Sequence, residues 1–349
     1  MNKENTATYI IVGAGLSGLT SAYEFMKQEE TNFLVLESRN RIGGRIMTKN
    51  GIDFGAAWFQ NHHQNVIDLV DDLDLQKFHQ YSKGKSVLVY NSMAPAHFFE
   101  SDPNAPAAYR IAGGSDAMIR NLAKDISEKI RTNTVVTELI ETPEGLTLVT
   151  TTGNYYAKKV ILAIPPRIAT RVSYTPELSE ATLSAMENTH TWMSNAIKVG
   201  LTFKTAFWRE KKMSGTLIGQ VGAVTELYDH NSLDGETFSL MGFVNEGLRE
   251  VSVVERKQKI LTHLKTHLGD EVLEYLSYEE KDWSKDKHTS CEQIKSIYLS
   301  PRYGNPVFSE FHLNGKLLFS GTETSPVYGG YMDGAIYSGI NATHKLLES

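Results

Sequence analysis

The chain has 349 residues, of which 41% are hydrophobic and 22% are charged. This length exceeds an average single core, so about two domains of roughly 150 residues each are expected, and the composition excludes collagen-like, coiled-coil and largely disordered chains. Thirty-five Lys and Arg against forty-one Asp and Glu give a net charge of −6, which argues against a nucleic-acid or anionic-membrane surface and favours a small-molecule partner.

The first sixty residues alternate strand and helix patterns. Residues 9–12 form a β-rich run, a glycine loop follows at Gly13, Gly15 and Gly18, and a helix pattern leads to a second strand at 33–36. In such a βαβ unit the first glycine permits a tight turn, the second lets the backbone approach a pyrophosphate, and the third allows close helix packing. The glycine trio alone also fits a turn that serves only packing, so its context must decide.

An acidic residue stands behind the glycine loop. Glu37 closes the second strand nineteen positions after Gly18, near the spacing of about 20 at which an acid accepts a hydrogen bond from a ribose hydroxyl. A carboxylate at this position disfavours a 2′-phosphate, so the pattern argues against NADP. The context therefore favours dinucleotide binding over simple packing.

A basic, glycine-containing run comes directly after this acid. Arg39 is followed by Gly43, Gly44 and Arg45, which predicts a second close approach of the backbone and a guanidinium able to fork onto a diphosphate. Arg41 by itself is better explained as a solvated basic residue. We expect Arg39, the two glycines and Arg45 to contact the cofactor.

Further elements follow in chain order. Helix patterns at 66–73 and 115–122 precede three β-rich runs at 134–140, 146–151 and 160–164, which predict an antiparallel meander ending at two prolines. The proline-rich residues 91–106 are expected to be irregular. Beyond residue 167 the chain mixes helices with strands, which predicts a second domain; the expected elements are helices at 178–186 and 254–268 and strands at 196–203 and 237–244.

The chain ends in a strand pattern, a glycine-rich turn and a helix. The turn contains Gly321 and Glu323, and the helix begins within a Gly-Tyr-Met-Asp-Gly-Ala run that includes Tyr331 and Met332. Glycines just before a helix let backbone N–H groups approach a phosphate or an electron-rich ring, and the helix N-terminus adds positive potential. The same pattern also fits a helix start that only packs on a sheet.

Together, the glycine loop, Glu37, the Gly-Gly-Arg run and the C-terminal run resemble the flavin monoamine oxidase family. The resemblance implies an α/β fold with a Rossmann-like FAD-binding domain of the glutathione-reductase type and an interleaved, mixed-sheet α+β substrate domain. We expect the FAD-binding domain to comprise residues 1–80, 107–166 and 285–349, and the substrate domain to comprise residues 81–106 and 167–284.

The resemblance also implies roles for individual residues. Those matching Tyr331 and Met332 lie at the isoalloxazine ring, where the tyrosine forms one wall of an aromatic cage for the substrate amine. Val136 falls where a valine backbone meets the adenine, and Gly321 and Glu323 lie in the flavin-contacting turn. Lys198 matches a strand lysine that holds a water against flavin N5, although a lone strand lysine also fits a solvated edge residue.

The activity implied is FAD-dependent oxidation of an amine C–N bond to an imine by hydride transfer, with oxygen as acceptor and hydrogen peroxide as product. Two alternatives remain open: a desaturase or porphyrinogen-type oxidase on the same fold, and a non-enzymatic FAD-binding interaction protein. No motif predicts a metal site, and His62-His63 is explained as loop surface or cavity rim. We expect a small-molecule amine and oxygen as partners.

Two departures from the family pattern refine the expectations about the site. Counted from Trp283, Cys291 falls one residue short of the flavinylated position and Glu292 takes its place, so we expect non-covalent FAD. Arg45 and Gly113 lie only 68 positions apart, too close for the helical roof of longer members. This predicts an open cavity, a bulky substrate and room for a homodimer whose second subunit completes the wall.

The sequence also predicts where the protein acts. The N-terminus has no apolar signal core, no apolar stretch is long enough to span a bilayer, and no apolar tail like that of the mitochondrial members precedes Ser349. The lone thiol of Cys291 suits a reducing compartment. We expect a cytoplasmic protein with no membrane partner.

Overall fold

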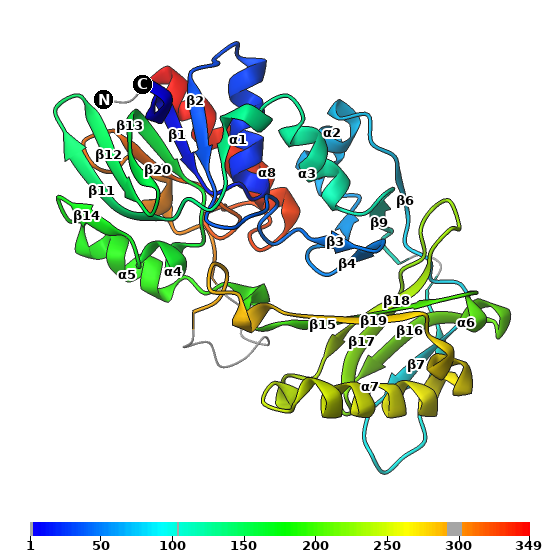
Figure 1. Cartoon of the computed structure of the whole chain (residues 1–349). Helices are drawn as coiled ribbons and strands as arrows, with labels where there is room; N and C mark the ends of the chain where they lie inside the picture. The colour runs from blue at the N-terminus through cyan, green and yellow to red at the C-terminus, as the bar shows by residue number, and fades with distance from the viewer. Residues whose placement is uncertain (1–2, 103–104, 292–301) are drawn as a thin grey trace.

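The computed structural model describes residues 3–102, 105–291 and 302–349. Two large β-sheets organise these residues, and Figure 1 shows them at opposite ends of the molecule with smaller sheets and loops between them. We call the eight-stranded sheet, which includes β1 (Thr6–Val12) and β20 (Leu317–Phe319), the first sheet. We call the seven-stranded sheet the second sheet.

The first sheet combines a parallel core with an antiparallel meander. Seven strands follow one another in the order β10 (Ile130–Arg131), β2 (Phe33–Leu36), β1 (Thr6–Val12), β13 (Gly153–Leu162), β12 (Gly145–Thr150), β11 (Val136–Thr142) and β14 (Ser173–Thr175), and β20 (Leu317–Phe319) also pairs with β13. Strands β1, β2, β10 and β20 run parallel to their neighbours, whereas β11, β12 and β13 alternate in direction. The expected βαβ unit and meander are both present.

Both faces of the parallel core are covered, which explains why β2 is apolar and buried throughout and why β1 ends in the buried residues Ile10, Ile11 and Val12. Ile11 packs with α1 (Leu16–Lys27) and α8 (Met332–Glu348) on one face, while its neighbours Ile10 and Val12 face the residues of the meander on the other. Side chains alternate between the faces of a strand, so one short run supplies both cores. Helices α2 (Gln64–Asp72) and α3 (Asp116–Ala123) extend the helical layer (Figure 1).

The segment after the meander corrects one expected domain boundary. Helices α4 (Pro166–Ala169) and α5 (Glu180–Asn188) pack against the meander, and β14 between them pairs with β11. Residues up to Asn188 therefore belong with the first sheet, not with the second as residues 167–284 were expected to do. The segment stays with the first sheet because its apolar residues Ala169, Leu178 and Met186 are buried in the core of the meander.

The second sheet is covered by α7 (Val253–Leu268) on one face, as Figure 1 shows, and α6 (Phe207–Glu210) lies at its side. Its strands follow the order β19 (Ser277–Asp282), β15 (Ile197–Phe203), β18 (Phe238–Val244), β17 (Val224–Asp229), β16 (Met213–Gly219), β7 (Lys85–Val89) and β8 (His97–Glu100). The helix expected at 254–268 and the strands expected at 196–203 and 237–244 are present.

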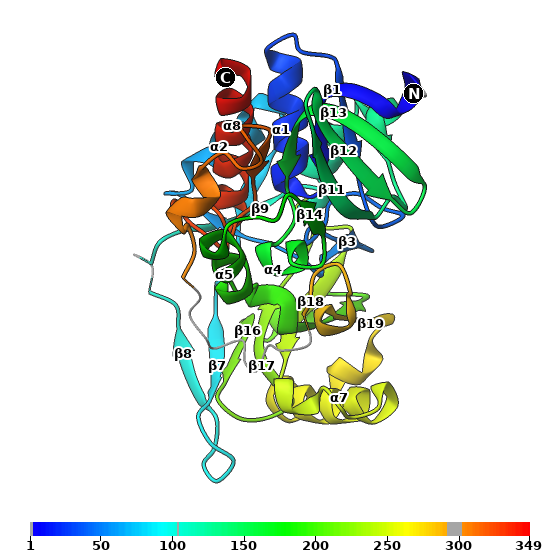
Figure 2. The same cartoon turned by 90° about the vertical axis from the view of Figure 1, so that its left-hand side faces the viewer.

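Part of the second sheet was not predicted. Residues 91–106 were expected to be irregular, yet β8 within them pairs antiparallel with β7, and Figure 2 shows this hairpin projecting from the molecule. Two short sheets lie between the large ones: β3 (Thr48–Lys49) with β4 (Ile52–Asp53), and β9 (Ala108–Ile111) between β5 (Phe59–Gln60) and β6 (Lys77–His79). Within the described residues no helix is both long and apolar enough to cross a bilayer.

Candidate functional site

A cavity of about 480 Å³ runs along the carboxyl ends of the parallel strands. This volume and place are typical of ligand sites in α/β proteins. Twelve of the fourteen residues expected in the site line it: Gly13, Gly15, Glu37, Arg39, Gly43, Gly44, Arg45, Val136, Gly321, Glu323, Tyr331 and Met332. The fold thus brings together segments from the start, the middle and the end of the chain.

The glycine loop lies where β1 ends and α1 begins. Gly13 has φ +107°, and a Cβ on it would come within 2.6 Å of the Ala163 carbonyl oxygen. Gly18 does not line the cavity, because it packs inside the loop: a Cβ there would lie 2.0 Å from the Gly13 carbonyl oxygen. Gly18 therefore shapes the loop rather than contacting a ligand. The N-terminus of α1 faces the cavity, which suits a phosphate.

Glu37 is buried at the end of β2, and both of its oxygens accept hydrogen bonds. Oε2 accepts from the Ala14 N–H at 2.9 Å, and Oε1 accepts from the Arg39 N–H at 2.8 Å. These bonds fix the carboxylate between the glycine loop and the next turn. A carboxylate held in this way at the cavity wall can also accept from a ribose hydroxyl.

The Gly-Gly-Arg turn approaches the glycine loop closely. A Cβ on Gly44 would lie 3.1 Å from the Gly15 Cα, so the two backbones can face a ligand together. Arg41, expected to be solvated, folds back instead and donates from its guanidinium to the carbonyls of Ile42, Gly44 and Ile46 at 2.7–3.2 Å. It holds the turn in shape.

Arg45 has a carboxylate partner that the sequence did not predict. Its Nη1 and Nη2 donate to Oε1 and Oε2 of Glu323 at 2.6 and 2.9 Å, a bidentate pair. The fork that the sequence assigned to a diphosphate is thus directed at a fully buried carboxylate. Both residues line the cavity, so the pair forms part of its wall.

The C-terminal turn brings aromatic rings to the cavity. Tyr331 lines it while staying 55% exposed, and its backbone carbonyl accepts a 2.7 Å hydrogen bond from the Thr322 hydroxyl. The His63 ring lies 5.1 Å from the Tyr331 ring and 4.9 Å from the Tyr328 ring. His63 is therefore a buried support for the tyrosines, and burial lowers the pKa of its imidazole.

Asp333 is a positioning residue that the sequence did not single out for this role. From the first turn of α8 it accepts hydrogen bonds from the Val66 N–H and the Asn65 side chain at the start of α2. It caps the helix that follows His63, and so ties that histidine to the turn bearing Tyr331. Contacts between helix starts 268 residues apart leave no local pattern to find.

Lys198 lies behind the cavity wall rather than on it. It is buried in β15, a strand with neighbours on both sides, so the solvated-edge explanation is wrong. Its Nζ donates to the carbonyls of Gly55 at 2.6 Å and Asp53 at 3.3 Å, and the adjoining Ala56 lines the cavity. Burial lowers the pKa of Lys198 to about 7, even though Asp53 opposes the shift.

Cys291 does not line the cavity. Its thiol lies 3.5 Å from the Arg167 carbonyl oxygen, and burial raises the pKa of the thiol. Glu292, expected at the flavinylated position, lies outside the described residues. No group of three or more His, Cys, Asp or Glu able to hold a metal occurs within the part of the chain that is described.

The model of one protein family, described as flavin containing amine oxidoreductase, matches residues 16–105 and 92–347. A probable flavin-containing monoamine oxidase A of Dictyostelium discoideum is 25% identical over 97% of this chain and 96% of its own length. Flavin-containing amine oxidase A of Equus caballus is 23% identical over 97% of this chain and 85% of its own.

Solved structures show the same fold. A putrescine oxidase bound to putrescine superimposes with a TM-score of 0.85 at 22% identity, over 99% of each chain. The cyclohexylamine oxidase of Brevibacterium oxydans superimposes with a TM-score of 0.84 at 19% identity, over 98% of this chain and 99% of its own. The expected α/β fold class is confirmed.

Proposed function

This chain belongs to the flavin containing amine oxidoreductase family, and on that premise we propose that it oxidises an amine to an imine with FAD held non-covalently in the cavity described above. One observation carries the proposal: a phosphate-type glycine loop, a buried acid and an exposed tyrosine line a single cavity. The loop and Glu37 suit the dinucleotide part of FAD, and Tyr331 with Met332 suits the reacting end.

The residues present fit FAD better than another dinucleotide. Gly15 and Gly44 let two backbone turns approach each other beside the cavity, and the N-terminus of α1 points to the same place. Glu37 offers a carboxylate to a ribose and disfavours NADP. Val136 and Thr134 line the wall beside Glu37, where they would meet the adenine. The free thiol of Cys291 outside the cavity supports non-covalent binding.

A bound flavin supplies the electron sink for oxidation of the amine carbon. The overall change removes two electrons and two protons from the amine; water then hydrolyses the imine to a carbonyl compound and ammonia or a smaller amine. If oxygen takes up those electrons and protons, hydrogen peroxide is formed. We infer that Tyr331 aligns the neutral amine against the reacting end, and that His63 supports this tyrosine from behind.

Lys198 has a different part in this proposal. Because it lies behind Gly55 and Ala56, it positions this wall through two carbonyl hydrogen bonds rather than by touching the amine. With a pKa of about 7, set mainly by burial, its ammonium group can hold or release a proton near neutrality. We propose that its positive charge favours reoxidation of the flavin by oxygen.

The alternatives lead to different measurements. A desaturase or porphyrinogen-type oxidase would give no amine-dependent peroxide, and an interaction protein would bind FAD without turnover. The family match and the amine oxidases among its relatives support amine oxidation. Mass spectrometry of the cofactor released on denaturation tests the first step: FAD is expected, and NAD or no nucleotide after reconstitution would overturn the proposal.

The proposal also includes the location, the electron acceptor and the oligomeric state of the enzyme. We infer a cytoplasmic location from the single cysteine, because reducing compartments do not favour disulfides. Oxygen as acceptor and a homodimer that completes the open cavity are part of the same proposal. Oxygen-electrode traces with an amine test whether oxygen is the acceptor. Light scattering of the purified protein tests whether it is a homodimer.

A further inference from the structure

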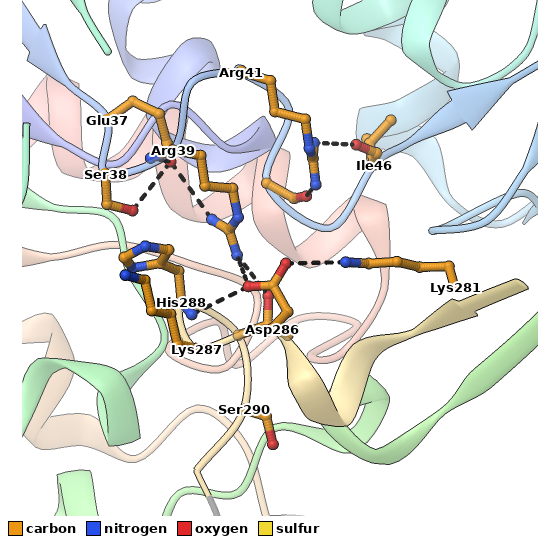
Figure 3. Close-up of polar contacts among 12 residues, drawn as sticks. Glu37, Ser38, Arg39, Arg41, Ile46, Lys281, Asp286, Lys287, His288 and Ser290 are labelled. Carbon is orange, nitrogen blue, oxygen red and sulfur yellow. Dashed lines mark hydrogen bonds and ion pairs between the residues drawn. The ribbon is translucent and has the colours of Figure 1, made fainter. Parts of the chain in front are cut away.

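A turn that follows the second sheet closes one end of the cavity. The segment that leads into it begins at Trp283, directly after β19, where the indole Nε1 donates to the Phe54 carbonyl at 2.8 Å. Lys287, His288 and Thr289 of this turn line the cavity together with Glu37. Figure 3 shows the turn beside Glu37 and Arg39, which come from the end of β2. We call residues 286–290 the closing turn.

Arg39 joins the closing turn to the buried acid. Its Nη2 donates to Asp286 Oδ1 at 2.7 Å and to Thr289 Oγ1 at 2.8 Å, and its Nη1 lies 3.5 Å from Glu37 Oε1. Its side chain is only 13% exposed. The guanidinium therefore lies between two carboxylates, one from each side of the cavity end (Figure 3).

Asp286 organises both this ion pair and the turn itself. Its Oδ1 also accepts from the His288 N–H at 3.1 Å, and its Oδ2 accepts from Lys281 Nζ of β19 at 3.3 Å. Burial alone would raise the pKa of Asp286, but the hydrogen bond and charge of Arg39, with Lys281, lower it to about 2. The carboxylate is therefore charged at all working pH values.

A second arginine holds the other side of the closing turn. Arg171, which precedes β14, donates to the carbonyls of Lys287 at 2.6 Å and Ser290 at 3.3 Å. The turn is thus fixed to the first sheet by Arg39 and Arg171 and to the second sheet by Lys281. Such closure hinders exchange of a ligand that lies beneath it.

We propose that Asp286 is a positioning residue for the cofactor, which holds Arg39 against Glu37 and closes the ribose end of the FAD site. The inference rests on the proposed function, because it takes FAD as the ligand. Replacing Asp286 removes the nearer of the two charged partners of a nearly buried guanidinium, and loss of such a partner acts mainly on dissociation rates. FAD then leaves the Asp286→Asn variant faster, while the amine site around Tyr331 is unchanged.

The test compares FAD release from the wild-type holoenzyme and from Asp286→Asn, followed by the fluorescence of free flavin after dilution. We expect release to be at least about tenfold faster in the variant. Asp270→Asn is the matched control, because it makes the same chemical change at a carboxylate that is 84% exposed and pairs with Lys265 on the surface. This control should release FAD at the wild-type rate.

The melting temperature of the FAD-free protein distinguishes a role of Asp286 in holding FAD from a role in stability alone. If Asp286→Asn lowers the melting temperature of the FAD-free protein but releases FAD at the wild-type rate, the inference is wrong. Thr289→Val keeps all charges and removes one acceptor of Arg39, so it replaces Asp286→Asn in the test if that variant does not fold. We expect FAD release from Thr289→Val to be a few-fold faster than from the wild type. Release at the wild-type rate would refute the inference. Absence of FAD from the wild type would instead refute the proposed function.

Discussion

Arg45 and Glu323 lie 278 residues apart in the chain and face each other across the cavity wall through two parallel hydrogen bonds of 2.6 and 2.9 Å. The pair connects the turn after β2 to the turn after β20. It therefore joins the N-terminal and C-terminal parts of the site.

Replacing Glu323 with Gln should destabilise the FAD-free protein. The change leaves Arg45 without its charged partner, and Arg45 is only 25% exposed. We expect a loss of about 2 to 3 kcal/mol in the free energy of unfolding, less than for a fully buried pair. Urea unfolding measures it, with Glu271→Gln on the exposed pair with Lys211 as control. Equal effects of the two changes would contradict the account.

Replacing Lys198 with Met should leave FAD bound and slow reoxidation of the reduced flavin. The change removes a buried positive charge beside the wall that bears Ala56. Loss of a preorganised electrostatic group costs about 2 to 4 kcal/mol in the affected step. Stopped-flow mixing with oxygen measures the rate. Lys204→Met at an exposed position is the control, and an unchanged rate in Lys198→Met would limit Lys198 to a structural role.

The same lysine should make stability depend on pH. Burial lowers its pKa in the folded protein to about 7 from 10.5, and Asp53 and Glu226 partly oppose this shift. Between these values the unfolded chain binds more protons, so the stability of the wild type rises with pH relative to Lys198→Met, by at most about 1.4 kcal/mol per pH unit. Urea midpoints at several pH values measure the difference. A constant difference between pH 7 and 10.5 would show that Lys198 is not desolvated.

FAD should separate from the protein on acid precipitation. Cys291 lies outside the cavity lining, with its thiol near the Arg167 carbonyl. We expect yellow colour in the supernatant, and the same FAD content in Cys291→Ser as in the wild type. Flavin in the pellet on a peptide that contains Cys291 would show that Cys291 itself occupies the flavinylated position, and would contradict non-covalent binding.

Local patterns predicted the parallel core and its glycine loop well. The roles of Ile11, Gly13 and Glu37 could be predicted from residue type and spacing, because a buried strand, a tight turn and the end of a strand each require a particular residue type at a fixed position. Family membership and fold class followed from such runs, and both are confirmed.

Contacts between distant segments could not be predicted in this way. Arg45 pairs with Glu323 and Arg39 pairs with Asp286, and neither spacing has a local pattern. The strand His97–Glu100 was missed because prolines surround it, although its pairing with β7 at the sheet edge tolerates them. The boundary at 167 was wrong because the core of the meander extends to Met186.

Anaerobic reduction of the bound flavin by a panel of amines tests the central claim most directly, because it requires both the cofactor and the reaction. The short segment between Arg45 and Gly113 predicts an open cavity, and hence that polyamines or bulky secondary amines bleach the visible absorbance faster than benzylamine-sized amines. Fast reduction by small amines, with bulky amines inert, would contradict the prediction about size. Bound flavin that no amine reduces would contradict amine oxidation itself.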